Sequence, residues 1–213
     1  MNTADSTTIT SIHSITLDAA DPDVAAAFYR DAFGLDARVH TRSLDPSVAS
    51  EGFRGYTMSL VASQPGNVTA LFEAAVAAGA TVLKPLAKSL WGFGGLIQAP
   101  DGAIWNLATS SKKDSAPASR DFDHIVLLLG VEDVAASKRF YVERGLAVGK
   151  SFGSYVDFAT PSSPIGLGLY KRRALAKSAG VAPEGSGSRR IRIDGSAGPF
   201  VDPDGFEWGG APE

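Results

Sequence analysis

The sequence predicts an α+β fold made of two copies of one unit, because its two halves repeat the same signals in the same order. Each half has a strand-like apolar stretch, a helix containing Phe-Tyr, a Gly-Leu exit and a late Asp-Gly turn followed by Trp. These signals occupy 12–35 and 99–105 in the first half, and 124–146 and 202–208 in the second. Two copies of a half-open sheet can enclose a cavity, so the repeat also bears on function.

Composition limits the classes of partner. The 213 residues are 44% hydrophobic and carry a formal net charge of -3, which suits a globular protein and gives no footprint for nucleic acid. The basic runs at 171–173 and 189–190 are short, and we expect them to be solvated. The absence of cysteine excludes disulfides and thiolate ligands. The first ten residues lack an apolar signal core, and no apolar run approaches the ~20 residues of a membrane helix, so we expect a cytoplasmic protein with no membrane partner.

The first half is expected to start with a strand at 11–19 and a helix that Asp21 and Pro22 begin and Gly34 ends. An Asp side chain can accept from free amides of the first turn, and Pro needs no partner there. The other elements expected are strands at 36–40 and 55–62, a mobile loop at 43–52, a helix from Asn67 to Gly79, and strands at 96–99 and 103–108 around Pro100-Asp101-Gly102.

The stretch 111–120 reads as a linker between a first module at 8–110 and a second at 121–213. The second module is expected to repeat the plan with shorter connections. Its expected elements are a strand at 124–129, a helix at 132–143, strands at 147–150, 155–159 and 166–170, a short helix at 173–179, a flexible connection at 183–188, and a last hairpin of 191–193 with 206–209.

This ordered set, together with Trp91-Gly92, resembles the vicinal oxygen chelate superfamily, the group of glyoxalase I, bleomycin-resistance proteins and extradiol dioxygenases. The resemblance covers 12–108 and 122–211. It implies two tandem βαβββ modules that form a paired half-barrel, with a ligand in the cup between them. The motifs are specific for the fold and not for the reaction.

The resemblance also implies where a metal would be bound, because metal-using members take ligands from the first and last strand of each module, usually His and Glu. Carried over, those four places hold Ser14, His124, Asn106 and Gly209. Of these only His124 is a good ligand, while His13 and Glu207 are neighbours that could substitute. Catalytic sites generally need about three protein ligands. We therefore expect no complete metal site and no cofactor, with a divalent metal ion as the alternative.

The candidate catalytic residues are His124 and Glu207, which could act as an acid–base pair if they share the cup. The candidate substrate-binding residues are aromatic or polar side chains that the resemblance places near the cup: Ser14, Tyr56, Trp91, Phe93, Asn106, Phe152 and Tyr155. An apolar, aromatic cup with few polar anchors suits a planar organic ligand.

Three functional hypotheses follow. The first is a protein that binds a small organic molecule without a metal, similar to the resistance proteins. The second is a metal-dependent lyase, isomerase or dioxygenase that uses His124, Glu207 and His13. The third is a module whose interface serves a protein partner. The sequence does not decide whether the protein is an enzyme, or whether one chain completes the cup or a homodimer does.

Overall fold

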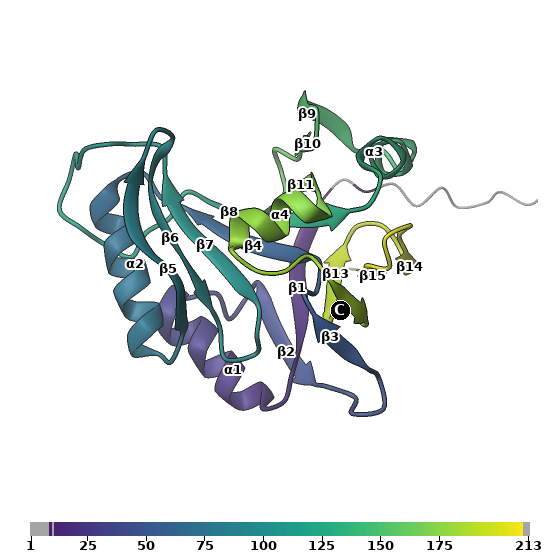
Figure 1. The fold of residues 1–213 in the computed structure, drawn as a ribbon, viewed down its shortest axis with the longest axis horizontal. Coiled ribbons are helices and arrows are strands. Elements are labelled where there is room, and N and C mark those ends of the chain that lie inside the picture. The colour runs from purple at the N-terminus through teal and green to yellow at the C-terminus, as the bar shows by residue number, and fades with distance from the viewer. Residues whose placement is uncertain (1–8, 10, 211–213) are drawn as a thin grey trace, which may run out of the picture.

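The computed structural model describes residues 9 and 11–210, which form an α+β fold with three sheets (Figure 1). The largest sheet has eight strands in the order β5-β6-β7-β4-β8-β11-β10-β9. These strands are β4 (Tyr56–Val61), β5 (Thr81–Ser89), β6 (Gly92–Gln98), β7 (Ile104–Thr109), β8 (His124–Val131), β9 (Ala147–Phe152), β10 (Tyr155–Ala159) and β11 (Ile165–Lys171).

A second sheet has five strands in the order β14-β15-β13-β1-β2, and a third pairs β12 with β3. These strands are β1 (Ile12–Ala19), β2 (Val39–Ser43), β3 (Ser50–Gly52), β12 (Gly185–Gly187), β13 (Ile191–Gly195), β14 (Phe200–Val201) and β15 (Glu207–Gly209). The helices are α1 (Pro22–Phe28), continued by the π-helical turn η1 (Tyr29–Phe33), then α2 (Pro65–Ala77), α3 (Val134–Glu143) and α4 (Arg172–Ala179).

The eight-stranded sheet contains two complete βαβββ units. One is β4-α2-β5-β6-β7 and the other is β8-α3-β9-β10-β11. In both units the last strand lies parallel to the first and antiparallel to the third, so the two units have the same topology. The expected α+β architecture with βαβββ units is confirmed.

Two antiparallel seams join the halves of the chain. In the eight-stranded sheet β4 pairs with β8, so Tyr56 lies opposite Leu129 and Val61 lies opposite His124. In the five-stranded sheet β1 pairs with β13. Both sheets therefore contain strands from each side of the linker. The two ranges expected as modules, 8–110 and 121–213, each contribute strands to both sheets.

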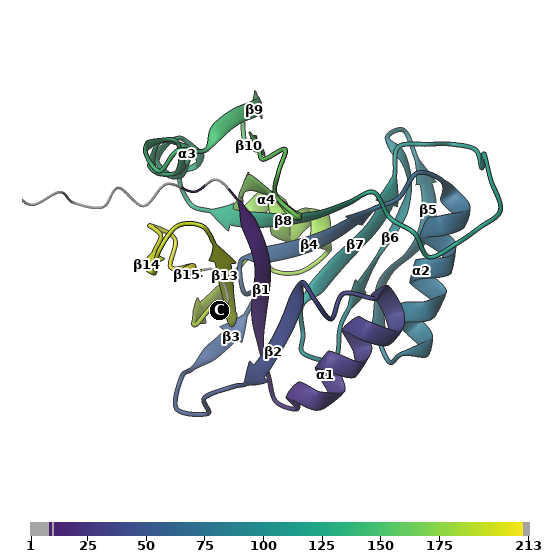
Figure 2. The same ribbon diagram turned by 180° about the vertical axis from the view of Figure 1, so that it is seen from behind.

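The eight-stranded sheet has two different faces. On one face, side chains of β4 and β7 such as Met58, Leu60 and Trp105 belong to the main apolar core. The opposite face, here called the α4 face, is defined by Thr57, Ser59, Leu96, Asn106 and Leu128, which line a small cavity against α4. Figure 1 shows α4 crossing in front of β4 and β8, and Figure 2 shows it behind them.

The helix starts follow local chemistry. The Asp21 carboxylate accepts from the amide of Val24, and the Asp133 carboxylate accepts from the amide of Ala135 at the start of α3. Helix α1 and its π-helical turn end at Gly34 in the left-handed region. The predictions for α1 and its end are confirmed.

Four details of the sequence interpretation are wrong. Strands β13 and β15 are parallel and form no hairpin, because β14 lies between them in the chain and pairs with β15 instead. The loop at 43–52 contains β3, which pairs with the expected flexible connection at β12. Helix α2 begins at Pro65 and not at Asn67. Arg172, expected in a solvated basic run, is only 6% exposed.

No helix in the described part of the chain has the length and apolar character that crossing a membrane requires.

Candidate functional site

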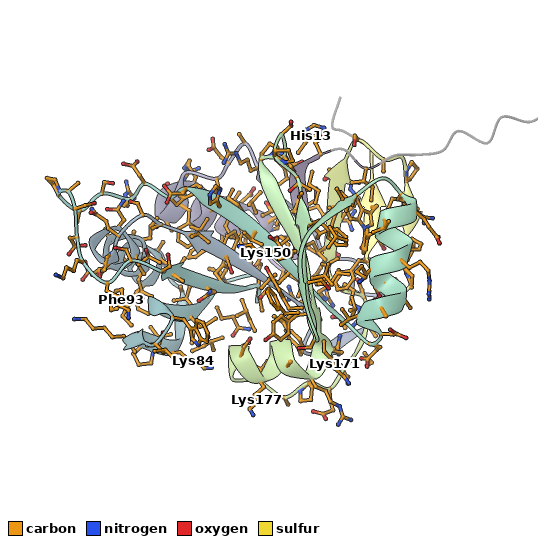
Figure 3. The ribbon with its side chains drawn as sticks, turned by 90° about the horizontal axis from the view of Figure 1, so that it is seen from above. His13, Lys84, Phe93, Lys150, Lys171 and Lys177 are labelled. Carbon is orange, nitrogen blue, oxygen red and sulfur yellow. The ribbon has the colours of Figure 1, made fainter. Side chains whose placement is uncertain are left out.

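A groove of about 810 Å³ lies on the α4 face and is lined by three of the predicted binding residues, Trp91, Phe93 and Asn106, although the Phe93 ring packs against the main core on the opposite face. Strands β5, β6 and β7 form its floor, and Ser178 of α4 closes one end. The Lys84 ammonium donates to the carbonyl of Ser178, which ties β5 to the end of α4. Figure 3 shows Phe93 and Lys84 to one side of α4, with Lys171 at the other end of the helix.

Trp91 owes its position to the glycine beside it. Gly92 has φ 136°, and a Cβ there would meet the carbonyl oxygen of Thr109 at 1.9 Å, so only glycine permits this close turn against β7. The turn leaves Trp91 85% exposed at the mouth of the groove. A large aromatic side chain presented in this way can stack on a planar molecule.

Helix α4 occupies the part of the α4 face where the two βαβββ units meet. Leu175 and Ala179 are buried against Leu96 and Leu128, and only about 130 Å³ remains beneath the helix. The expected cup is therefore not one open hollow, because the chain fills its centre with its own helix.

Arg172 fixes α4 in this place. Its guanidinium donates to the carbonyls of Phe53 and Pro183, so the helix is tied to the segments before β4 and before β12. Burial and the neighbouring Arg189 lower the pKa of Arg172, but a guanidinium stays charged far above neutral pH. Sequence analysis missed this residue, since only the apolar spacing of Leu175, Ala176 and Ala179 could have indicated that α4 has a buried face.

The other predicted binding residues lie elsewhere. Phe152 and Tyr155 face each other across the β9–β10 hairpin, on the far side of α4 from the groove. Phe152 is 74% exposed, and the Tyr155 ring lies 5.7 Å from that of Tyr170. Tyr56 lines a separate cavity of about 320 Å³.

The candidate catalytic pair is not brought together. His124 lies at the exposed start of β8 in the eight-stranded sheet, whereas Glu207 lies on β15 in the five-stranded sheet. The nearest cation to Glu207 is Arg42, whose Nη2 lies 3.6 Å from the carboxylate. His13 lies on β1, and its Nε2 is 2.9 Å from the hydroxyl oxygen of Ser11.

The residues at the four family ligand positions do not fit a metal ion. They divide between the two sheets, with Ser14 and Gly209 on one and His124 and Asn106 on the other. Among the described residues, no three His, Asp or Glu side chains gather in a way that could hold a metal. A hydroxyl, an amide and a glycine also make a poor donor set.

A larger side chain does not fit at Gly209. A Cβ at this position would lie 2.5 Å from the Asp194 carboxylate and 3.1 Å from Nε of Arg192. Arg192 donates to Asp194, which also accepts from the hydroxyl of Thr16. This ion pair fills the space that a glutamate at 209 would need. Ser14, on β1, is 1% exposed, and its Oγ has no hydrogen-bond partner.

The repeated sequence motifs form two matching hydrogen-bonded triads. In the first, the Tyr29 hydroxyl donates to Asp101 at 2.8 Å and accepts from Trp105 Nε1 at 3.4 Å. In the second, Tyr141 donates to Asp202 at 2.6 Å and accepts from Trp208 Nε1 at 3.3 Å. Sequence analysis found the motifs but not the contacts between them.

Comparisons with known proteins agree with this fold. No protein-family model and no curated protein matches the sequence. Among solved structures, the chain is similar to glyoxalase I from Zea mays, with a TM-score of 0.61 and 15% identity over 93% of this chain and 90% of that one. It is also similar to a protein of Bacillus subtilis named as a candidate dioxygenase, with a TM-score of 0.53 and 12% identity over 92% of this chain and 72% of that one.

At these identities the likeness concerns the fold alone. This structural similarity agrees with the paired βαβββ units and with the doubled motifs of the sequence. The chain shares its fold with glyoxalase I from Zea mays, which agrees with the resemblance in the sequence motifs.

Proposed function

We propose that this protein binds a small planar organic molecule in the groove beside α4, and that it does so without a complete metal site. The observation that carries this proposal is the groove itself, which is lined by Trp91 and Asn106 and has a volume of about 810 Å³. That volume is in the range of small-molecule sites. The protein named as glyoxalase I from Zea mays shares this fold.

The groove offers two kinds of contact. Trp91 presents an indole ring at the mouth, where stacking on a flat ligand would remove apolar surface from water. Asn106 lies deeper, on β7, and supplies an amide that can both donate and accept. A ligand with one aromatic face and one polar edge matches this arrangement.

The donor set argues for binding without a metal. Asn106 is the family ligand position that lies in the groove, and an amide oxygen is a weak ligand for a divalent ion. We therefore derive no step that depends on a metal ion.

The proposal is tested by titrating the protein with 8-anilino-1-naphthalenesulfonate and following its fluorescence. We expect saturable binding that Trp91→Ala weakens about three- to ten-fold, which is the usual size of an aromatic pair interaction. Phe152→Ala is the matched control, because it also removes an exposed aromatic ring next to a strand turn of the eight-stranded sheet.

Equal affinity in both variants would contradict the groove as the binding site. Sedimentation velocity distinguishes the remaining hypothesis of a protein interface. If Trp91→Ala converts an oligomer into a monomer and leaves dye binding unchanged, the exposed tryptophan serves chain association instead.

A further inference from the structure

The groove beside α4 continues beneath the helix into the small cavity of the α4 face. Leu96, Asn106 and Ser178 line both hollows, so the two spaces adjoin near the end of α4. The cavity has a volume of about 130 Å³, which is close to that of protein cavities that admit one aromatic ring. One end of a ligand in the groove can therefore reach under the helix.

Three polar side chains in this cavity have no partner in the protein. Thr57 and Ser59 lie on β4, and Asn106 lies opposite Ser59 on β7. None of the three side chains forms a hydrogen bond with any residue that the structure describes. Thr57 and Ser59 are only 3% and 5% exposed, yet their hydroxyl oxygens are not among the unpaired atoms sealed from solvent. The little surface that these hydroxyls expose therefore faces the cavity.

Strand alternation directs these hydroxyls into an apolar enclosure. Met58 and Leu60 belong to the main core, so Thr57 and Ser59 point to the opposite face of the sheet. The apolar walls around them are Leu96, Leu128 and Leu175. Buried polar groups are nearly always hydrogen-bonded, so these two hydroxyls need a partner from outside the chain.

The partner must both donate and accept hydrogen bonds. Water can supply these bonds in the free protein, since a polar cavity of this size can hold it. A ligand that displaces such water keeps its affinity only if it makes the same hydrogen bonds. Hydroxyls and an amide each donate and accept, so the matching ligand group does both.

The spacing favours a group with two polar atoms. Thr57 and Ser59 are two residues apart on one strand, where side chains on the same face repeat about every 7 Å. One oxygen atom cannot approach both at hydrogen-bond distance when they are this far apart. A carboxamide has a carbonyl oxygen and an NH₂ group on opposite sides of one carbon, so it can bond to two separate partners.

The cavity also favours an uncharged group. None of the described residues that line it is charged. Lys84 supplies the charge in the groove, and its ammonium already donates to the carbonyl of Ser178. A carboxylate beneath α4 would lose its hydration without gaining an opposite charge, and that costs far more than burying a neutral amide.

We propose that the ligand of the groove is an uncharged planar molecule that ends in a carboxamide. The carboxamide binds beneath α4 to Thr57, Ser59 and Asn106, and the aromatic body lies in the groove towards Trp91. This inference rests on the proposed function, because it names the class of molecule that the groove binds.

The experiment compares three molecules of nearly the same shape: 2-naphthamide, 2-naphthoate, which is charged, and 2-acetylnaphthalene, which has a methyl group in place of NH₂. We expect calorimetric titration at neutral pH to show saturable binding of 2-naphthamide. The other two should bind about ten-fold more weakly or worse, because one buries a charge and the other leaves an acceptor of the cavity unpaired.

Removing a hydroxyl of the cavity should reduce the affinity for the amide. Ser59→Ala should weaken 2-naphthamide about three- to ten-fold, the usual effect of one hydrogen bond. Thr57→Val, which keeps the shape of the side chain, is a second variant with the same expected loss. Ser151→Ala is the control, because it removes a hydroxyl from β9 of the same sheet, outside both hollows.

The inference is overturned if 2-naphthoate or 2-acetylnaphthalene binds as tightly as 2-naphthamide, or if neither Ser59→Ala nor Thr57→Val weakens the amide. Titration with 8-anilino-1-naphthalenesulfonate shows whether each variant keeps a folded groove. If the dye binds through Trp91 while the three naphthalenes bind alike, the carboxamide inference fails and the groove remains. If neither the dye nor 2-naphthamide binds, the groove proposal fails and this inference fails with it.

Discussion

The two Tyr-Asp-Trp triads have the same hydrogen bonds but different surroundings. Trp105 lies on β7 inside the eight-stranded sheet and packs against the rings of Tyr29 and Phe33. Trp208 lies on the three-residue strand β15, next to the edge strand β14, and stacks on Phe200. The comparison teaches that the sequence repeat encodes a structural device, which holds a helix to the turn before a late strand.

The largest difference between the triads should appear when their tryptophans are truncated. We expect Trp105→Ala to lower the free energy of unfolding by about 3–5 kcal/mol, the usual cost of removing a buried Trp side chain. Trp208→Ala should cost less, because the short edge hairpin around it can collapse into the space. Urea unfolding of both variants measures the two values. Equal losses would show that the second triad is as tightly enclosed as the first.

Removing the tyrosine hydroxyl of each triad should change the free energy of unfolding by more similar amounts. Tyr29→Phe and Tyr141→Phe each leave a buried carboxylate oxygen without its donor, at a cost of about 1–3 kcal/mol. Because the hydrogen bonds correspond, we expect the two losses to be of similar size. The same urea unfolding measures them. A loss at one tyrosine alone would mean that the matching geometry hides unequal energies.

The smallest effect should be the acid dependence of stability. Burial raises the pKa of both Asp101 and Asp202 above 3.8, although the tyrosine hydroxyls and backbone amides act in the opposite direction. A raised pKa in the folded state stabilises the protein below pH 3.8, and this contribution is lost as the pH rises through the folded value.

Asp101→Asn and Asp202→Asn should each remove part of this loss, because an amide does not titrate. The measurement is the free energy of unfolding against pH from 3.8 upward, with Asp45→Asn as an exposed control. The idea fails if the double Asn variant keeps the same dependence on pH as the unsubstituted protein.

Local signals predicted much of the fold. Asp21 and Pro22 start a helix, Gly34 ends it, and Asp101-Gly102 makes a turn in the structure as in the sequence. The start of α2 was misjudged at Asn67, whose side chain instead bonds Gln64 and the linker. Pro65 was the better signal, because Pro is favoured at the first helical position.

The candidate site was only partly predictable. Trp91, Phe93 and Asn106 line one groove, since all three lie on adjacent strands or their turn, but the Phe93 ring packs against the main core. His124 and Glu207 do not meet, because strand partners far apart in sequence cannot be read from alternation alone.

The sequence by itself determined the repeat, most helix ends, the turns and the residue types at the positions where the resemblance implies metal ligands, because these depend on residue types at short range. Only the tertiary structure decided that both sheets take strands from each half, that α4 fills the centre of the expected cup, and that an arginine–aspartate pair occupies the place of the missing glutamate. The reason is physical: strand pairing and helix docking depend on which distant surfaces are complementary, and that is fixed only when the whole chain packs.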